Sequence, residues 1–226
     1  MKKLFHISDI HIRNGDKKAS RYQEYSKVFD NLFISLKDNI TKYKLNKSDY
    51  LIIITGDIFH NKNVIGNFGL ELYNKFIKGL TDIGTTIIFH GNHDRNQNEI
   101  DQPSLISSTI EIENLRILKS TQSFVIDDIG FSYVNIDDTL DKTSTVGRVK
   151  NLPAFPDISS NVSKKVALFH GTFGNVKLYN GTQVLNSTNP YPFEWISQFD
   201  FALLGDIHLR QKGMYDDLLW GYAGSL

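Results

Sequence analysis

Short apolar runs that end in polar residues recur along the chain and predict buried strands. The run over residues 50–55 is apolar almost throughout, which is typical of a strand covered on both faces. Apolar residues then repeat every three or four positions from Tyr22 to Tyr43 and again over residues 68–80, so we expect two amphipathic helices there. Further strands are predicted at residues 4–8, 83–89, 166–169 and 201–204. This alternation of strands and helices predicts an α/β protein with a parallel sheet.

The pattern is weaker between residues 95 and 164. Short alternating runs at 116–118, 123–126 and 131–136 predict a second sheet, with a hairpin turn at Asp127-Asp128-Ile129-Gly130. Residues 139–163 are mostly polar and contain two prolines, which predicts a surface loop. Beyond them we expect a loop with a possible hairpin over 171–189, a short helix over 192–198 and a closing hairpin at residues 213–215 and 219–223.

Five of the predicted strands run directly into aspartate, asparagine or histidine. The segments are Asp9-Ile10-His11, Gly56-Asp57-Ile58-Phe59-His60, Gly91-Asn92-His93-Asp94, His170-Gly171 and Gly205-Asp206-Ile207-His208. Ligands in open α/β sheets bind beyond the carboxyl ends of the strands, so these segments predict one shared site. Any single segment is better explained by turn formation, but histidine is not a favoured turn residue and it recurs at all five ends.

Composition limits the chemistry of this site. The 226 residues are 40% hydrophobic, which suits one globular domain, and they include no cysteine. A metal would therefore be held by oxygen and imidazole ligands, as manganese, iron, magnesium and zinc can be. The 25 basic and 25 acidic residues give no overall charge that would attract nucleic acid. With no apolar stretch of bilayer length and no signal peptide, we expect a soluble, cytoplasmic protein.

The carboxylates and imidazoles suit a centre with two divalent cations. Asp57 has two carboxylate oxygens and is the predicted bridge between them. The remaining predicted ligands are Asp9, His11 and His208 for one cation, and Asn92, His170 and Asp206 for the other.

Three further residues are predicted to act in catalysis. His93 is not needed as a ligand, so we expect it to contact the substrate phosphate or protonate the leaving oxygen, with Asp94 orienting it. His60 is a second candidate, for which a loop-bracing role is an equal alternative. His6 and His90 lie inside predicted strands and are expected to be core or supporting histidines.

Taken together, the five segments resemble the motifs of calcineurin-like metallophosphoesterases over nearly the whole chain. Residues 7–13, 56–60, 203–208 and the closing Tyr222-Ala223-Gly224-Ser225-Leu226 are similar to the SbcD and meiotic recombination eleven branch of DNA repair nucleases. This resemblance implies a four-layer αββα sandwich and manganese-dependent exonuclease and endonuclease activity on DNA. It also implies a coiled-coil ATPase of the SbcC type as partner, with a homodimer as a further expectation and the nucleoid or a viral factory as alternative locations.

The chain departs from the family pattern at two places. Asp206 stands where the family usually has histidine, so the second cation site is more anionic and should favour manganese or magnesium. The chain also ends at Leu226, where the nucleases continue into a DNA-capping domain and an ATPase-binding segment. We therefore expect residues 1–226 to be the catalytic domain without those regions, either trimmed or from a minimal relative.

The substrate is the most open part of the interpretation. Basic residues beside the motifs are candidates for contacts to DNA phosphates, although each is also explained as an ordinary solvated charge. They are Arg13, Arg95 and Arg210, with Lys62 and Lys212. The alternatives are a small-molecule or phosphoprotein phosphoesterase, which the neutral net charge favours, and a non-catalytic scaffold of the same fold, for which lost ligand residues would be the signature.

Overall fold

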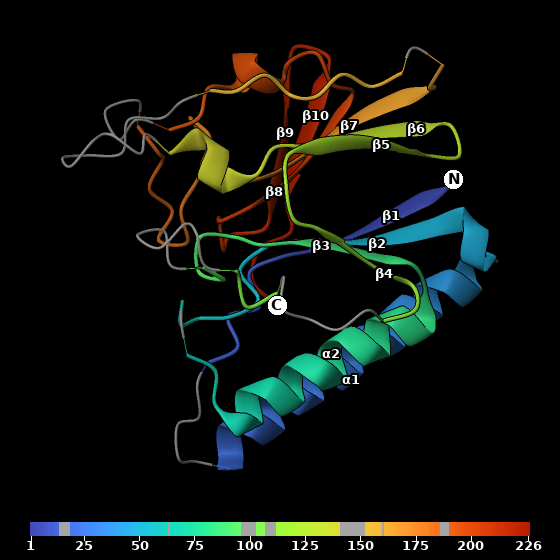
Figure 1. Cartoon of the computed structure of the whole chain (residues 1–226), viewed down its shortest axis with the longest axis vertical. Coiled ribbons are helices and arrows are strands. Elements are labelled where there is room, and N and C mark those ends of the chain that lie inside the picture. The colour runs from blue at the N-terminus through green and yellow to red at the C-terminus, as the bar shows by residue number, and fades with distance from the viewer. Residues whose placement is uncertain are drawn as a thin grey trace.

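A computed structural model describes residues 1–13, 19–62, 64–95, 103–106, 112–140, 152–159, 161–185 and 190–226. Figure 1 shows two stacked β-sheets with a pair of long helices beneath them. The lower sheet contains β1 (Lys3–Ile7), β2 (Tyr50–Thr55), β3 (Thr86–Phe89) and β4 (Leu115–Leu118) in that order, and all three pairings are parallel. Every residue of β2 and β3 is buried, as the apolar runs predict.

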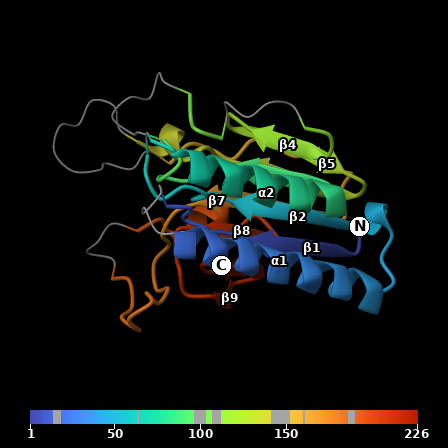
Figure 2. The same ribbon diagram turned by 90° about the horizontal axis from the view of Figure 1, so that it is seen from below.

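Helices α1 (Ala19–Lys42) and α2 (Asn67–Ile83) cover the outer face of this sheet (Figures 1 and 2). The Phe29 and Phe76 rings meet between the helices with centroids 4.8 Å apart. The predicted strand over residues 83–89 is too long, because α2 continues to Ile83, where the Gly84 N–H donates to the Leu80 carbonyl. A short 3-10 turn, η1 (Lys47–Asp49), leads from the first helix into β2.

The upper sheet has six strands in the order β5-β6-β7-β8-β10-β9. Its four central strands pair in parallel, while β5 and β9 are antiparallel edge strands. The bounds are β5 (Gln122–Ile126), β6 (Ile129–Tyr133), β7 (Lys164–His170), β8 (Phe201–Gly205), β9 (Gln211–Tyr215) and β10 (Leu218–Tyr222). Phe89, Phe131 and Leu168 belong to the apolar cluster between the two sheets.

Turns and loops cover the outer face of the upper sheet in the part of the chain that the structure describes. The predicted strand over residues 131–136 ends at Tyr133, because the Asn135 side chain accepts from the Asp137 N–H and starts the 3-10 turn η2 (Ile136–Thr139). The short helix expected over 192–198 is the 3-10 turn η4 (Phe193–Ile196), packed in an aromatic cluster that includes Phe173 and Trp195.

The α/β class and the sandwich of two sheets are therefore confirmed, with α-helices outside the lower sheet and 3-10 turns and loops outside the upper sheet in the described chain. None of the described helices combines the length and the apolar character that crossing a bilayer requires.

Candidate metal centre

The carboxyl ends of strands from both sheets meet at one edge of the sandwich. The His170 Nδ1, at the end of β7, lies 2.7 Å from the Thr55 carbonyl at the end of β2. After β8, the Asp206 N–H donates to Asp9 Oδ1 over 3.2 Å, and the Asp9 N–H donates to the Gly56 carbonyl over 3.2 Å. Segments up to 197 residues apart in sequence are thus joined directly.

Asp9, Asp57 and His170 form the buried half of the centre. One ligand atom of each lies within 4.8 Å of the others, and their side chains are at most 2% exposed. Because the Thr55 carbonyl can only accept, Nδ1 of His170 must donate to it, which turns Nε2 towards Asp57 Oδ1 at 3.3 Å. The hydrogen bond to Thr55 fixes the orientation of the His170 ring. Histidines that bind metals are commonly oriented in this way, by a hydrogen bond from the other ring nitrogen to a backbone carbonyl.

The charges of the buried half stabilise one another. Burial opposes charge on each group, yet the Asp57 and Asp206 carboxylates raise the pKa of His170 well above its usual value. Burial likewise works against ionised Asp57, but the His170 imidazolium and the His93 N–H hold the pKa of Asp57 well below its usual range. Burial raises the pKa of Asp9.

His11 and His208 form the exposed half of the centre. Their Nε2 atoms are 2.9 Å apart, and together with Asp9 they make a second cluster whose ligand atoms lie within 4.8 Å. His11 Nε2 also lies 3.5 Å from Asp57 Oδ2, which links the two halves. Burial lowers the pKa of His11 to about 4, so this imidazole is neutral and able to bind a cation in the physiological range. The His208 side chain is 47% exposed.

Asn92 and Asp206 complete the predicted ligand set. The buried Oδ1 of Asn92 makes no hydrogen bond within the described residues. Asp206 Oδ1 lies 3.9 Å from His170 Nε2, and its Oδ2 accepts a short hydrogen bond from the Thr172 hydroxyl. Asp206 Oδ1 therefore lies near the buried half, and its role as a ligand stays a prediction.

Several predicted ligands at this edge have a strained backbone. Four predicted ligands have positive φ angles, a conformation that non-glycine residues adopt at a cost of about 1–3 kcal/mol each. They are Asp9 (54°), His11 (49°), Asp57 (54°) and Asp206 (95°). Gly56 and Gly91 permit the close approach, because a Cβ on Gly56 would lie 2.6 Å from His170 Nδ1 and one on Gly91 would collide with Asp57 Oδ1. The strain is typical of a functional site.

The predicted catalytic residues lie in two different environments. His93 and His60 line the rim, with ring centroids 5.8 Å apart, and the His93 ring packs 5.0 Å from His11. Nδ1 of His93 faces the His60 carbonyl at 2.9 Å. Asp94 does not orient the His93 ring as predicted, because its buried carboxylate accepts from the Phe59 and Gly91 N–H groups. Burial raises the pKa of Asp94 to about 7, and its role is to brace the loop.

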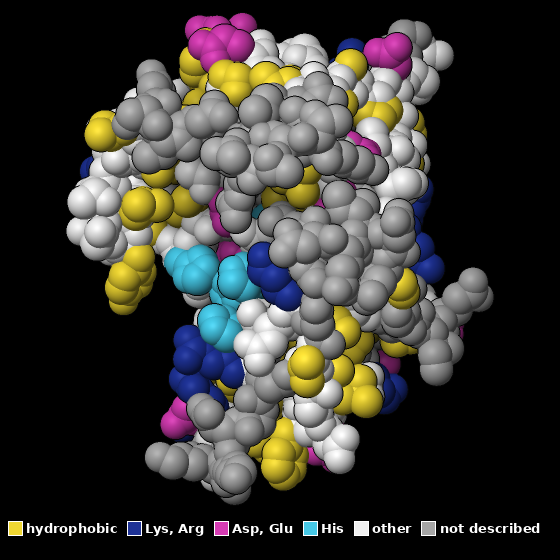
Figure 3. All heavy atoms as spheres, turned by 60° about the vertical axis from the view of Figure 1, so that its left-hand side comes forward, with side chains coloured by type: hydrophobic (Ala, Val, Ile, Leu, Met, Phe, Trp, Pro, Cys, Tyr) yellow, Lys and Arg dark blue, Asp and Glu magenta, His cyan; other side chains and the backbone are white. Residues whose placement is uncertain are grey.

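The basic candidates differ in how they are held. Arg95 Nη1 binds Asp137 Oδ2 at 2.5 Å, and His90 Nε2 lies 3.1 Å from the same oxygen, so this arginine is paired with a buried carboxylate. Arg13, Arg210 and Lys212 are exposed, and Lys62 is half-buried. Figure 3 looks onto this edge and shows histidine side chains gathered in a hollow, with lysine and arginine side chains beside them.

The residues present fit divalent cations. Two buried polar atoms, His11 Nδ1 and Asn92 Oδ1, have no hydrogen-bond partner in the described part of the chain, and His170 Nε2 faces the Asp57 carboxylate, 3.3 Å away. Buried polar atoms are costly when unpaired, and nitrogen and oxygen donors beside carboxylates are the ligands of manganese, iron and zinc. Manganese is the cation we expect from the hard oxygen ligands, with magnesium, iron and zinc as alternatives.

Comparison with known proteins identifies the family. A family model described as calcineurin-like phosphoesterase matches residues 2–210. The chain belongs to the calcineurin-like phosphoesterase family. Members of this family are metal-dependent hydrolases with dinuclear centres, which agrees with the possible cation site at Asp9, Asp57 and His170. The branch within the family stays a prediction.

A relative of this phosphoesterase occurs in Acanthamoeba polyphaga mimivirus. The uncharacterised protein R555 of that virus is 32% identical over 236 aligned residues, which cover the whole of this chain. The chain spans only 16% of the length of that viral protein. The similarity therefore concerns the phosphoesterase domain alone.

Sequence reasoning missed the residues that support the centre. Thr55 holds His170, and Asp137 binds His90 from 47 residues away and Arg95 from 42 residues away. Asn135, which starts a turn by accepting from the Asp137 N–H, is a local hint that Asp137 is held in place. The neighbouring sequence does not indicate that His90 and Arg95 are the residues that Asp137 binds. His6 is satisfied by the Thr55 hydroxyl at 3.0 Å, as expected of a core histidine.

Proposed function

We propose that this phosphoesterase hydrolyses phosphodiester bonds of DNA with two manganese ions. The observation that carries the proposal is the rim of the centre, where Arg95 is already paired with Asp137 and where His60 and His93 are not needed as ligands of the two predicted cations. The ligand atoms of His11, His60 and His93 also lie within 4.8 Å of one another, so the proposal assigns the last two to the substrate and not to a metal. A phosphomonoester carries two negative charges and favours an unpaired arginine close to the metals, whereas a diester carries one and has less need of such a clamp. The rim therefore favours a diester.

Each residue has a defined role in this proposal. Asp57 would be the bridging ligand, Asp9, His11 and His208 would hold one cation, and Asn92, His170 and Asp206 would hold the other. When bound, the two cations supply charge neutralisation at the phosphoryl group and an activated water.

His93 is the proton donor in the proposed reaction. The His60 carbonyl accepts from Nδ1 of His93, which orients the ring and leaves Nε2 to face the substrate. A proton on Nε2 is then available to the leaving oxygen of the substrate. Arg13 is exposed beside His60, where its positive charge acts on that ring, and it is placed to contact a neighbouring phosphate of the strand.

The resemblance to the SbcD and meiotic recombination eleven nucleases favours DNA over other diesters as the substrate. It is carried above all by Gly56-Asp57-Ile58-Phe59-His60, whose last residue lies on the rim of the centre. The same resemblance is our reason for proposing a coiled-coil ATPase partner.

A matrix of metals and substrates tests the proposal. Protein loaded with manganese, magnesium or zinc is assayed on single-stranded DNA, duplex DNA, a chromogenic phosphodiester and a phosphomonoester. We expect manganese to support DNA cleavage, with kcat/KM at least about 10-fold higher for diesters than for the monoester. Preferred hydrolysis of the monoester would indicate a small-molecule or phosphoprotein phosphoesterase, and full metal loading without any hydrolysis would indicate a scaffold.

A further inference from the structure

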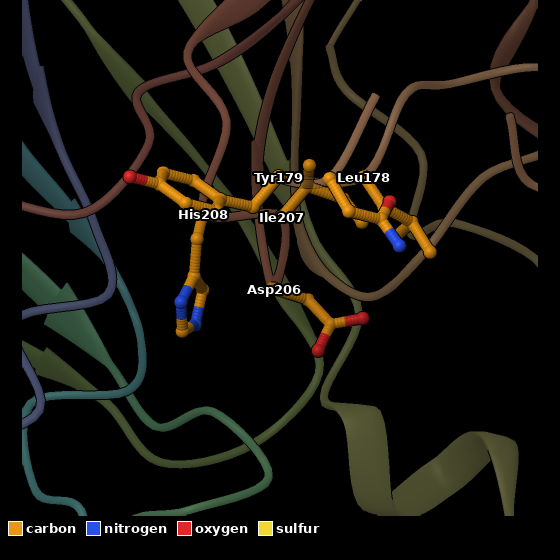
Figure 4. A pocket seen from close by; sticks show the side chains of 6 residues that line it. Leu178, Tyr179, Asp206, Ile207 and His208 are labelled. Atoms are coloured by element: carbon orange, nitrogen blue, oxygen red, sulfur yellow. The ribbon is translucent and has the colours of Figure 1, made fainter. Parts of the chain in front are cut away.

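A cavity of about 380 Å³ opens beside the metal centre. It is lined by Leu178, Tyr179, Asn180, Asp206, Ile207 and His208. In Figure 4 the Asp206 carboxylate and the His208 imidazole extend away from Leu178 and Tyr179, which lie above them. Because Asp206 and His208 are predicted cation ligands, a phosphate bound at the centre would lie at the mouth of this cavity.

Tyr179 lies at the tip of a hairpin that is firmly anchored. Val176 and Val184 are buried at its base, and the Val184 N–H donates to the Val176 carbonyl over 2.8 Å. A turn closes the tip, where the Gly181 N–H donates to the Leu178 carbonyl over 2.9 Å.

A second tie joins the hairpin to strand β9. The Gln211 side chain accepts from the Lys177 N–H over 3.0 Å and donates to the Lys177 carbonyl over 2.7 Å. The hairpin tip is therefore held in one position relative to the upper sheet, although its residues are exposed.

The Tyr179 side chain has no packing role that would explain an aromatic residue at this tip. The residue is 83% exposed, the most exposed large apolar residue of the described chain, whereas tyrosines such as Tyr133 and Tyr222 are buried in the core. An aromatic ring on a rigid support loses little entropy on binding, and exposed rings of this kind stack against nucleobases. An exposed ring in this position, beside the metal centre, is suited to contact a substrate.

We propose that Tyr179 is a stacking platform for a nucleobase adjacent to the scissile phosphate, an inference that rests on the proposed DNA phosphodiesterase activity. The walls of the cavity are apolar at Leu178 and Ile207, and its carboxylate, Asp206, repels a second phosphate but not a neutral base. A volume of about 380 Å³ lies at the lower end of the range for sites that hold one small molecule, which suits one nucleotide rather than a duplex.

The test uses single-stranded oligonucleotides with one phosphodiester among uncleavable methylphosphonate linkages. The substrates differ in the two nucleotides that flank the phosphodiester: each of these nucleotides either carries its base or is abasic. With manganese, we expect the wild type to show a kcat/KM about 10-fold higher when the base is present on one of the two sides. Tyr179→Ala should reduce this preference to about twofold or less, while Tyr179→Phe, which keeps the ring, should retain it.

Two controls make the result specific. Tyr43 is 52% exposed and stacks with Lys3 near the start of β1, at the opposite end of the sheet, so Tyr43→Ala should retain the preference. The second measures stacking without turnover, through 2-aminopurine at the preferred position of an uncleavable strand. Wild-type protein should quench its fluorescence, and Tyr179→Ala should not.

The possible failures are distinguishable. If the wild type cleaves DNA but shows no base preference, or if Tyr179→Ala keeps both the preference and the quenching, the platform is wrong and the nuclease proposal stands. If the manganese-loaded wild type cleaves none of the DNA linkages but hydrolyses another phosphate ester, the nuclease proposal fails and the platform fails with it.

Discussion

The two halves of the metal centre differ in how they are embedded in the protein. Asp57 and His170, in the buried half, are 2% and 1% exposed and lie between the two sheets at the ends of β2 and β7. In the exposed half, His11 is 12% exposed and His208 is 47% exposed. The buried half therefore holds charged groups in fixed positions, while the exposed half leaves room for water and substrate.

This difference separates two requirements of a hydrolytic centre. Burial strengthens the attraction between carboxylates and a cation, but it requires that every charge has a partner. Exposure weakens the attraction and lets the substrate reach the cations. The chain meets both requirements by bridging the halves with Asp57, whose Oδ1 lies 3.3 Å from His170 Nε2 and whose Oδ2 lies 3.5 Å from His11 Nε2.

The largest effect is expected for Asp57→Asn, which removes the charge that joins the halves without changing the size of the side chain. A neutral amide is a poor bridge between two dications, so manganese content and phosphodiesterase activity should be lost together, the activity by more than roughly 1000-fold. Metal analysis and a chromogenic phosphodiester measure both. Asp82→Asn, at a 64% exposed carboxylate of α2, is the matched control and should leave both unchanged. Cleavage by the Asp57→Asn protein would contradict the bridging role.

Replacing one histidine in each half tests the comparison directly. His170→Gln should weaken manganese binding by more than about 100-fold, because water cannot reach the vacated position and Asp57 loses its partner. His208→Gln should weaken it by only about 10-fold, since solvent can replace an exposed ligand. Manganese titration of both variants gives the two values, and equal losses would show that burial does not distinguish the halves.

His93→Ala should reduce kcat by about 100-fold while the manganese content stays at the wild-type level, since this imidazole is assigned to proton transfer. Single-turnover kinetics and metal analysis on the same sample check both statements. A parallel loss of metal would make His93 a ligand instead.

The two halves should also respond differently to pH. His170 has a raised pKa, so a cation must displace its proton, and manganese affinity should fall by up to about tenfold for each pH unit below that pKa. His11, with a pKa of about 4, adds no such competition near neutral pH. Manganese titrations at several pH values measure the slope, and an affinity that does not change with pH would contradict the raised pKa.

The raised pKa of His170 also predicts how the stability of the metal-free protein depends on pH, and here a lower pH is favourable. The pKa of His170 is higher in the folded than in the unfolded chain, so its contribution to stability without metal is complete below about pH 6.5. That contribution is lost as the pH rises through the folded pKa. Urea unfolding in the presence of a chelator should show this loss for the wild type and not for His170→Gln.

Much of the site could be predicted because the signals are local. Continuous apolar runs predict parallel strands, whose carboxyl ends lie at the same edge of a sheet. The polar residues after β1 and β2 were therefore expected together, as were those after β7 and β8, whereas the meeting of the two pairs depends on how the two sheets pack. Asp57 could be assigned to the site from its place directly after an apolar strand and a glycine, without knowing which strand lies beside it.

Other features depend on contacts that no local pattern encodes. The role of Asp94 is set by the Phe59 N–H, 35 residues away, and that of Arg95 by Asp137, 42 residues away. The position of Tyr179 beside Asp206 depends on the bonds between Gln211 and the hairpin. Helix ends were also misjudged, because the last turn of α2 is completed by a backbone bond rather than by a distinctive side chain.

The most direct test of the account is a crystal structure of the manganese-soaked phosphoesterase with anomalous scattering data. We expect two anomalous peaks roughly 3.5–4 Å apart. One should be bound by Asp9, His11 and His208 and the other by Asn92, His170 and Asp206, with one oxygen or both of Asp57 shared between them. A single peak at full soaking, or two peaks that share no ligand at Asp57, would contradict the account.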